Sequence, residues 1–196
     1  MILYFDTETT SLYPGQICQL SYVMQRHNTL ECKNFFFSVN SVDINAQLVH
    51  GFSKEKLEVL SSGKTFGYHA KEIFNDFSQA KVVVAHNVAF DISFLRAEFE
   101  RLGIQLQDLN AFCTMKKSVP LCKIARKNGG YKYPKLVELC SFLCLRQDEI
   151  NNACIKLFGS RVGFHDARFD TVSLYLLAQR GMQNYSQVFE LQQYIK

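Results

Sequence analysis

The sequence has no apolar run of about 18 residues, the length that a membrane-spanning helix needs. Its amino terminus also lacks the arginine-led apolar stretch of a signal peptide. The seven cysteines are an odd number, are scattered and include no C-x-x-C pair, which predicts reduced thiols rather than a disulfide framework or a zinc knuckle. Internal repeats, low-complexity tracts and clear linkers are absent as well. We therefore expect a soluble, cytoplasmic protein with no membrane partner.

The length and the apolar content suit a single domain. With 196 residues, of which 47% are hydrophobic, the chain can bury a sizeable core but has little room for two full domains. We expect one domain over residues 1–196.

Acidic residues are missing between Leu109 and Val137, although the net charge of the whole chain is only +4. The segment contains seven cations, namely Lys116, Lys117, Lys123, Arg126, Lys127, Lys132 and Lys135. Tyr131 and Tyr133 lie among them, and the rest of the chain is mildly acidic. Clustered cations with interleaved aromatic residues favour a polyanion as ligand. A solvated loop without a partner is the other interpretation.

The spacing of apolar residues predicts an α/β protein. Strands are expected at 2–6, 16–25, 30–39 and 81–85, the first three as an antiparallel meander with Pro14-Gly15 in its first gap. Helices are expected at 43–49, 53–61, 65–79, 90–102, 135–145, 166–180 and 185–195. Ser53 and Thr65 are the expected N-caps of two of them, and Gly103 follows the end of a third. Together these elements make an α/β sheet with helices on its faces.

Two carboxylates end the first strand with a single residue between them. In the stretch FDTET, Asp6 and Glu8 project from the same side of the strand because side chains alternate between its faces. Two like charges held so close repel each other. A divalent cation between them would make the arrangement favourable, since hard metals such as Mg2+ take oxygen ligands.

Two further acids and a histidine occupy positions from which they can join this pair. Asp91 begins a helix directly after a strand, where clefts form in α/β proteins. Asp170 lies in a later helix, with Asp166 as its expected N-cap. His165 then lies just outside that helix on a loop, free to point at whatever Asp170 binds.

Taken in order, these segments resemble a known pattern. FDTETTSL, HNVAFDISFL and HDARFD resemble the three motifs of the DnaQ-like exonucleases, with the histidine spacing of the branch called DEDDh. VHGFS resembles the intermediate motif of the family, and TMKKSVPLCK resembles the segment that follows its second motif. Ser11 departs from the pattern, because most members have glycine there. If that position requires a positive φ, serine is strained.

The resemblance implies a ribonuclease-H-like fold, a mixed sheet of about five strands with the first three antiparallel. It also implies a 3′→5′ exonuclease that releases nucleoside 5′-monophosphates with two Mg2+ ions, which Mn2+ can replace. Asp6, Glu8 and Asp170 would hold the ion that binds the attacking water. Asp6 would bridge to a second ion supported by Asp91. His165 would take the proton from the water, since histidine titrates near neutral pH.

Substrate contacts follow from the same resemblance. Thr9 and Thr10 would hold the terminal nucleotide and Leu12 would wedge against its base. Val49 and His50 would line the same pocket, and Phe90 would pack under the metal site or against the sugar. For His50, a hydrogen-bonding role at a helix end is the alternative. His86 and Asn87 are expected to brace the second motif, and Cys140 and Cys144 are not expected to bind metal.

The polymer and the partners are less constrained by the sequence. DNA with a single-stranded or frayed 3′ end is the first choice, for repair or proofreading. An exoribonuclease of the RNase T or oligoribonuclease type is the alternative, because selection against RNA depends on how one pocket wall treats the 2′-hydroxyl. In a third interpretation, the protein has the fold but only binds a nucleic-acid end, without catalysis. A separate polymerase chain or a second copy in a homodimer are the candidate protein partners.

Overall fold

A computed structural model describes residues 1–12, 15–27 and 29–195. The strands are β1 (Ile2–Thr9), β2 (Ile17–Arg26), β3 (Thr29–Phe36), β4 (Val82–Ala85) and β5 (Ala111–Cys113). The helices are α1 (Ile44–His50), α2 (Lys54–Ser61), α3 (Phe66–Ser78), α4 (Val88–Arg101), α5 (Thr114–Lys117), α6 (Val119–Cys122), α7 (Leu136–Phe142), α8 (Gln147–Phe158) and α9 (Ala167–Asn184). A 3-10 turn, η1, spans Gln192–Tyr194.

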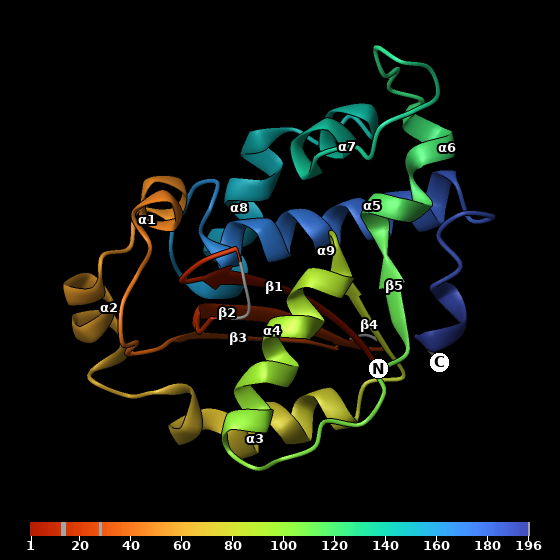
Figure 1. Cartoon of the computed structure of the whole chain (residues 1–196). Coiled ribbons are helices and arrows are strands. Elements are labelled where there is room, and N and C mark those ends of the chain that lie inside the picture. Colours follow the sequence, from red (N-terminus) through yellow and green to blue (C-terminus); the bar gives the residue numbers. More distant parts are fainter. Residues whose placement is uncertain (13–14, 28, 196) are drawn as a thin grey trace.

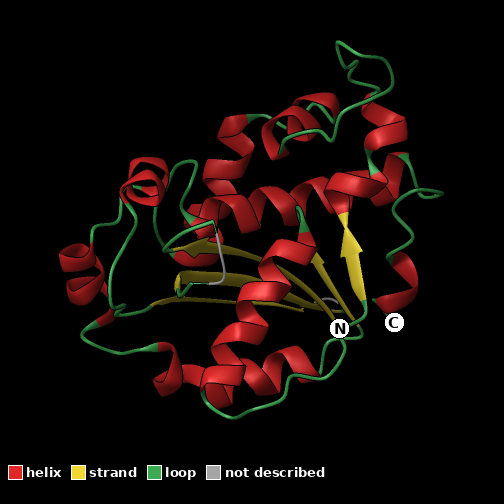
Figure 2. Ribbon diagram, viewed as in Figure 1, coloured by secondary structure: helices red, strands yellow, loops and turns green. Residues whose placement is uncertain are grey.

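The five strands form one mixed sheet in the order β3-β2-β1-β4-β5 (Figure 2). β1 pairs antiparallel with β2, and β2 pairs antiparallel with β3. On the other side, β4 runs parallel to both β1 and β5. This arrangement confirms the predicted mixed sheet with three antiparallel strands first. β1 is the central strand, so its side chains reach both helical layers.

Alternation along β1 divides the core into two halves. Leu3 and Phe5 pack on the face covered by α3 and α4, whereas Ile2 and Tyr4 pack on the face covered by α7, α8 and α9. Figure 1 shows α9 lying across one face of the sheet and α3 and α4 on the other. Asp6 and Glu8, farther along β1, therefore lie between two layers of helices.

The helix ends follow local chemistry. Ser53 caps α2 by accepting from the Lys56 amide at 3.2 Å, as predicted. Thr65 stands at the N-cap position of α3 but makes no side-chain capping bond. Gly103, with φ +69°, follows the end of α4 in the left-handed conformation that glycine adopts readily. The predicted turn at Pro14 lies outside the described residues.

Five elements differ from the sequence prediction, among them the short helices α5 and α6, which the sequence did not predict. The expected helix over 185–195 is wrong, because within these residues only the turn η1 is helical and the apolar side chains instead pack back onto α9. The sequence reading missed α8 entirely. It also missed β5, whose three residues are too few to show a period.

In the described part of the chain, no helix combines the length and the apolar character that crossing a bilayer requires.

Candidate functional site

The predicted acids converge from three elements. Asp6 and Glu8 lie on β1, Asp91 lies in the first turn of α4 and Asp170 lies in the first turn of α9. Carboxylate oxygens of Glu8 and Asp170 and a ring nitrogen of His165 all lie within 4.8 Å of one another. Asp91 is joined to β1 through Thr7, whose hydroxyl donates to Asp91 Oδ1 at 2.8 Å.

His165 lies on the loop before α9, as predicted, and not in the helix. Its side chain is exposed and its φ is +61°, an uncommon value for a residue other than glycine. The backbone amide of His165 donates to Asp170 Oδ2 at 3.2 Å. Asp166 caps α9 by accepting from the Arg168 amide, which confirms its predicted role. The cap and the loop together place the imidazole beside the acids.

Gln19 links β2 to the start of α9 beside the acids, and the sequence analysis did not identify it. It lies opposite Glu8 in the β1–β2 pairing and is completely buried. Its amide nitrogen donates to Asn34 Oδ1 at 2.8 Å and to Asp166 Oδ1 at 3.0 Å, and its carbonyl oxygen accepts from the Ala167 amide at 3.0 Å. One side chain on β2 therefore fixes the start of α9.

Burial and mutual repulsion oppose ionisation of the four acids. Burial raises the pKa of Glu8 to about 8 and the pKa values of Asp91 and Asp170 to about 7. The pKa of Asp6 is raised well above its ordinary value, first by burial and then by the charges of Asp170, Asp91 and Glu8. The guanidinium of Arg168 does not relieve this repulsion, because it pairs with Asp166 at 2.7 Å.

This donor set fits divalent metal ions. Its carboxylates supply the hard oxygen ligands that Mg2+ and Mn2+ prefer, and their crowding is relieved by positive charge. Apolar packing alone would disfavour four carboxylates in one buried place, because a buried charge costs free energy unless it is paired.

A pocket of about 420 Å³ opens beside Glu8. Its lining consists of Thr7, Glu8, Thr9, Ser11, Leu12, Asp43, Asn45, Ala46, Val49, His50 and Phe90. Five of the six expected substrate contacts are among these residues. Thr10 is the exception; its hydroxyl accepts from the Gln16 amide at 3.0 Å.

Three of the pocket residues bear on open questions from the sequence. Leu12 is 84% exposed, so its side chain is available to a ligand. His50 lines the pocket and also accepts from the Phe52 amide at 3.0 Å, so both interpretations of this residue apply. Ser11 does not have a positive φ, and serine in place of glycine is therefore unstrained.

His86 and Asn87 brace the start of α4. The ring of His86 bridges two segments, with Nδ1 3.0 Å from Thr114 Oγ1 and Nε2 3.0 Å from the Pro134 carbonyl oxygen. Because a carbonyl only accepts, Nε2 donates to Pro134. Burial lowers the pKa of His86, which favours the neutral ring. Asn87 turns the chain into α4 with φ +81°.

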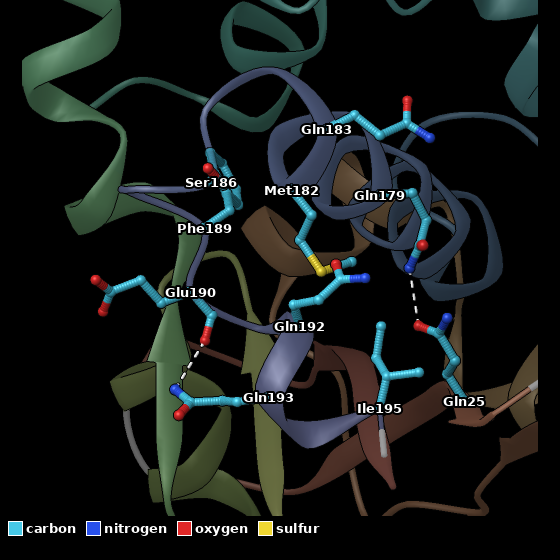
Figure 3. A pocket seen from close by; sticks show the side chains of 10 residues that line it. All are labelled: Gln25, Gln179, Met182, Gln183, Ser186, Phe189, Glu190, Gln192, Gln193 and Ile195. Atoms are coloured by element: carbon cyan, nitrogen blue, oxygen red, sulfur yellow. Dashed lines mark hydrogen bonds between the residues drawn. The ribbon is translucent and has the colours of Figure 1, made fainter.

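A larger hollow, of about 900 Å³, lies at the opposite end of α9 (Figure 3). Its side chains include Gln25, Gln179, Gln183, Gln192 and Gln193. None of the predicted site residues lines it, so the acids and this hollow are separate features.

Comparison with known proteins gives consistent results. The pattern of a family described as "Exonuclease" matches residues 3–145. DNA polymerase III subunit epsilon of Buchnera aphidicola is 26% identical over 196 residues, covering 93% of this chain and 76% of that protein. The subunit of the same name from Escherichia coli is 32% identical over 168 residues, covering 81% of this chain and 64% of that protein.

The fold has solved relatives. The structure of E. coli exonuclease I in complex with a dA16 oligonucleotide has a TM-score of 0.71 at 16% identity, covering 96% of this chain and 42% of that one. At this identity the likeness establishes the fold, which is ribonuclease-H-like. Because the family pattern covers most of the sequence and the acids and histidine occur in the expected order, the chain belongs to the exonuclease family, as a DnaQ-like protein of the DEDDh type.

Proposed function

We propose that the chain is a metal-dependent 3′→5′ exonuclease that removes nucleoside 5′-monophosphates from the 3′ end of DNA, with single-stranded or frayed ends preferred. The observation that carries the proposal is the gathering of Glu8, Asp170 and His165 within 4.8 Å beside a nucleotide-sized pocket. Subunit epsilon relatives and the likeness to exonuclease I support it.

The acids would hold two Mg2+ or Mn2+ ions. Asp6, Glu8 and Asp170 would bind one, and Asp6 with Asp91 would bind the other. When bound, such ions neutralise phosphate oxygens, promote deprotonation of water and stabilise the leaving oxygen.

The protein's own groups would perform the remaining tasks. Leu12, Val49 and Phe90 would seat the terminal nucleotide, with Leu12 against the base. His165 would accept a proton from the water that attacks phosphorus, and its exposure lets the proton pass to solvent. The bond from phosphorus to the 3′ oxygen of the preceding nucleotide breaks, that oxygen is protonated, and the terminal nucleotide leaves as a 5′-monophosphate.

The first test is degradation of matched 5′-labelled single-stranded DNA and RNA, with Mg2+ or with EDTA. We expect a ladder that shortens from the 3′ end of DNA, requires the metal and disappears with Asp6→Ala. Faster loss of RNA would instead place the protein among exoribonucleases. Binding without any ladder would support the end-binding interpretation and contradict an enzyme.

The role of His165 has its own test. His165→Ala should lower kcat by about 100-fold or more, which is the usual scale for loss of a general base. Calorimetric titration should show that Mg2+ still binds, because the acids remain. Loss of metal binding in this variant would show that the imidazole is a ligand rather than a base.

A separate polymerase chain is the protein partner that the epsilon relatives favour. Size-exclusion chromatography with light scattering would distinguish a monomer, which leaves a surface free for such a chain, from a homodimer.

A further inference from the structure

Residues 123–135, here called the basic ribbon, form a separate projection between α6 and α7. Ala125 and Tyr131 pair as an antiparallel bridge, and the Lys132 amide donates to the Ile124 carbonyl at 2.9 Å. Gly129 and Gly130, at φ +86° and +72°, make the turn at its tip. Figure 1 shows the ribbon extending away from the helices that cover the sheet.

The side chains of the basic ribbon differ in their surroundings. Lys132 faces α7, where its amino group pairs with Glu138. Tyr131 and Tyr133 are 48% and 50% exposed, so about half of each aromatic side chain is open to solvent. Two aromatic side chains of the ribbon are thus accessible to a ligand.

The charge of the basic ribbon is not neutralised within it. Lys123, Arg126 and Lys127 are exposed, and the nearest acid in sequence, Glu138, is already engaged. Glu138 accepts from Lys132 and from the Lys135 amide, at 2.7 Å for the latter. The ribbon therefore carries three exposed cations and two half-exposed aromatic rings.

The base of the basic ribbon is joined to the segment that links β4 to α4. His86 joins Thr114, at the start of α5, to Pro134 at the end of the ribbon, with both contacts at 3.0 Å. The same histidine follows β4 and precedes the helix that carries Asp91. One half-buried imidazole therefore ties the ribbon to the chain segment that leads into the acid cluster.

We propose that the basic ribbon binds the single strand on the 5′ side of the nucleotide being removed. This inference rests on the proposed function and specifies its substrate as an extended strand. Cations would contact phosphates, while Tyr131 and Tyr133 would stack on unpaired bases, a combination that is typical of single-strand binding. The bases of a duplex are stacked on one another, so their faces are not accessible to tyrosine rings. An acidic protein partner would need the cations but not the exposed tyrosines.

The test compares a long single-stranded oligothymidylate with a substrate too small to reach the ribbon, the p-nitrophenyl ester of thymidine 5′-monophosphate. The variants are Lys123→Gln/Arg126→Gln/Lys127→Gln and Tyr131→Ser/Tyr133→Ser. A matched control, Lys54→Gln/Lys71→Gln/Lys156→Gln, removes three exposed cations from α2, α3 and α8.

For the triple ribbon variant, we expect the Kd of the long strand, measured by fluorescence anisotropy in EDTA, to rise about tenfold or more. The slope of log affinity against log salt should fall by about 2, corresponding to three lost contacts at 0.7 each. The tyrosine variant should weaken binding without changing that slope. Hydrolysis of the ester should be unaffected in both, and the control should behave as the wild type.

An unchanged Kd and salt slope in the triple ribbon variant would overturn the inference and favour an acidic protein as the ligand of this surface. Equal losses in the control would also overturn it, because they would show only a general charge effect. If no form hydrolyses the ester or the oligonucleotide but ribbon-dependent binding persists, the proposed function fails while the binding inference is supported.

Discussion

The acid cluster destabilises the folded protein when its carboxylates are ionised without a bound cation. Four carboxylates converge on one point, and each has its pKa raised mainly by burial. A folded-state pKa above the unfolded value means that protonation favours folding. The stability that these acids contribute is therefore present at low pH and is lost as pH rises through their folded-state pKa values.

We predict that the melting temperature of the protein in EDTA falls between about pH 4 and about pH 8, the window from ordinary carboxyl pKa values to the raised ones. Mg2+ should raise the melting temperature more at the upper end of this range, where the acids are ionised. Differential scanning calorimetry with and without Mg2+ measures both effects, and Asp170→Asn should reduce the slope. A pH-independent melting temperature in EDTA would contradict the clustering.

Sequence reasoning reached these acids because their evidence is local. Asp6 and Glu8 share a strand face by alternation alone, and His165 precedes a recognisable helix cap. Gln19 gave no such signal, since its hydrogen-bonding partners lie 15 to 148 residues away in the chain. The role of a buried glutamine in a strand becomes apparent only when the strands and helices packed around it are known.

At the scale of elements, α9 is attached to β2 by two glutamines. Gln19 binds Asp166 and Ala167 at the start of the helix, while Gln25 accepts from Gln179 at 2.8 Å and from the Tyr4 hydroxyl at 3.0 Å. Both glutamines are buried, but only the first lies next to the acid cluster. This makes Gln25 a matched control for Gln19.

Gln19→Met keeps the side-chain length and removes the hydrogen bonds. We expect kcat to fall about tenfold with little change in KM, because misplacing a reacting group costs rate more than binding. Gln25→Met should lower the melting temperature to a similar degree but preserve kcat. Equal kcat values in the two variants would show that Gln19 is only a structural residue.

Prediction of the helices and strands succeeded where the regular spacing of apolar residues continued over enough residues. The strands of the meander and the helices α3, α4 and α9 lie where the apolar spacing indicated. The segment 185–195 has apolar residues at a helical spacing but uses them to cover α9 and the sheet edge. Tertiary packing overrode the local pattern there.

At the scale of the whole molecule, the carboxyl-terminal segment closes the core at the end away from the acids. Phe189 is 1% exposed and packs with Phe112, their ring centroids 5.9 Å apart. The Met1 amino group donates to the Tyr194 carbonyl at 3.3 Å, so the two ends of the chain meet (Figure 1). Gly181 on α9 leaves the space that the ring of Phe189 occupies.

Gly181→Ala should destabilise the protein, because the added Cβ would lie 2.6 Å from ring carbons of Phe189. Overpacking of this kind costs about 1–3 kcal/mol, more than the gain of about 1 kcal/mol in helix propensity. In a Phe189→Ala background, the same change should instead stabilise. Urea unfolding of the four proteins measures the sign reversal, and a destabilisation unaffected by Phe189→Ala would exclude the ring as its cause.

The sequence by itself determined the paired acids, the order of the motifs, the expected fold and the unusual charge of residues 109–137, because each depends on residue type and short spacing. Only the tertiary structure decided that Glu8, His165 and Asp170 meet, that the Thr10 hydroxyl accepts from the Gln16 amide and that Gln19 binds the N-cap residue of α9. It also decided that Lys132 is neutralised while Tyr131 and Tyr133 remain open. These outcomes depend on contacts between distant segments, which periodicity within one segment cannot encode.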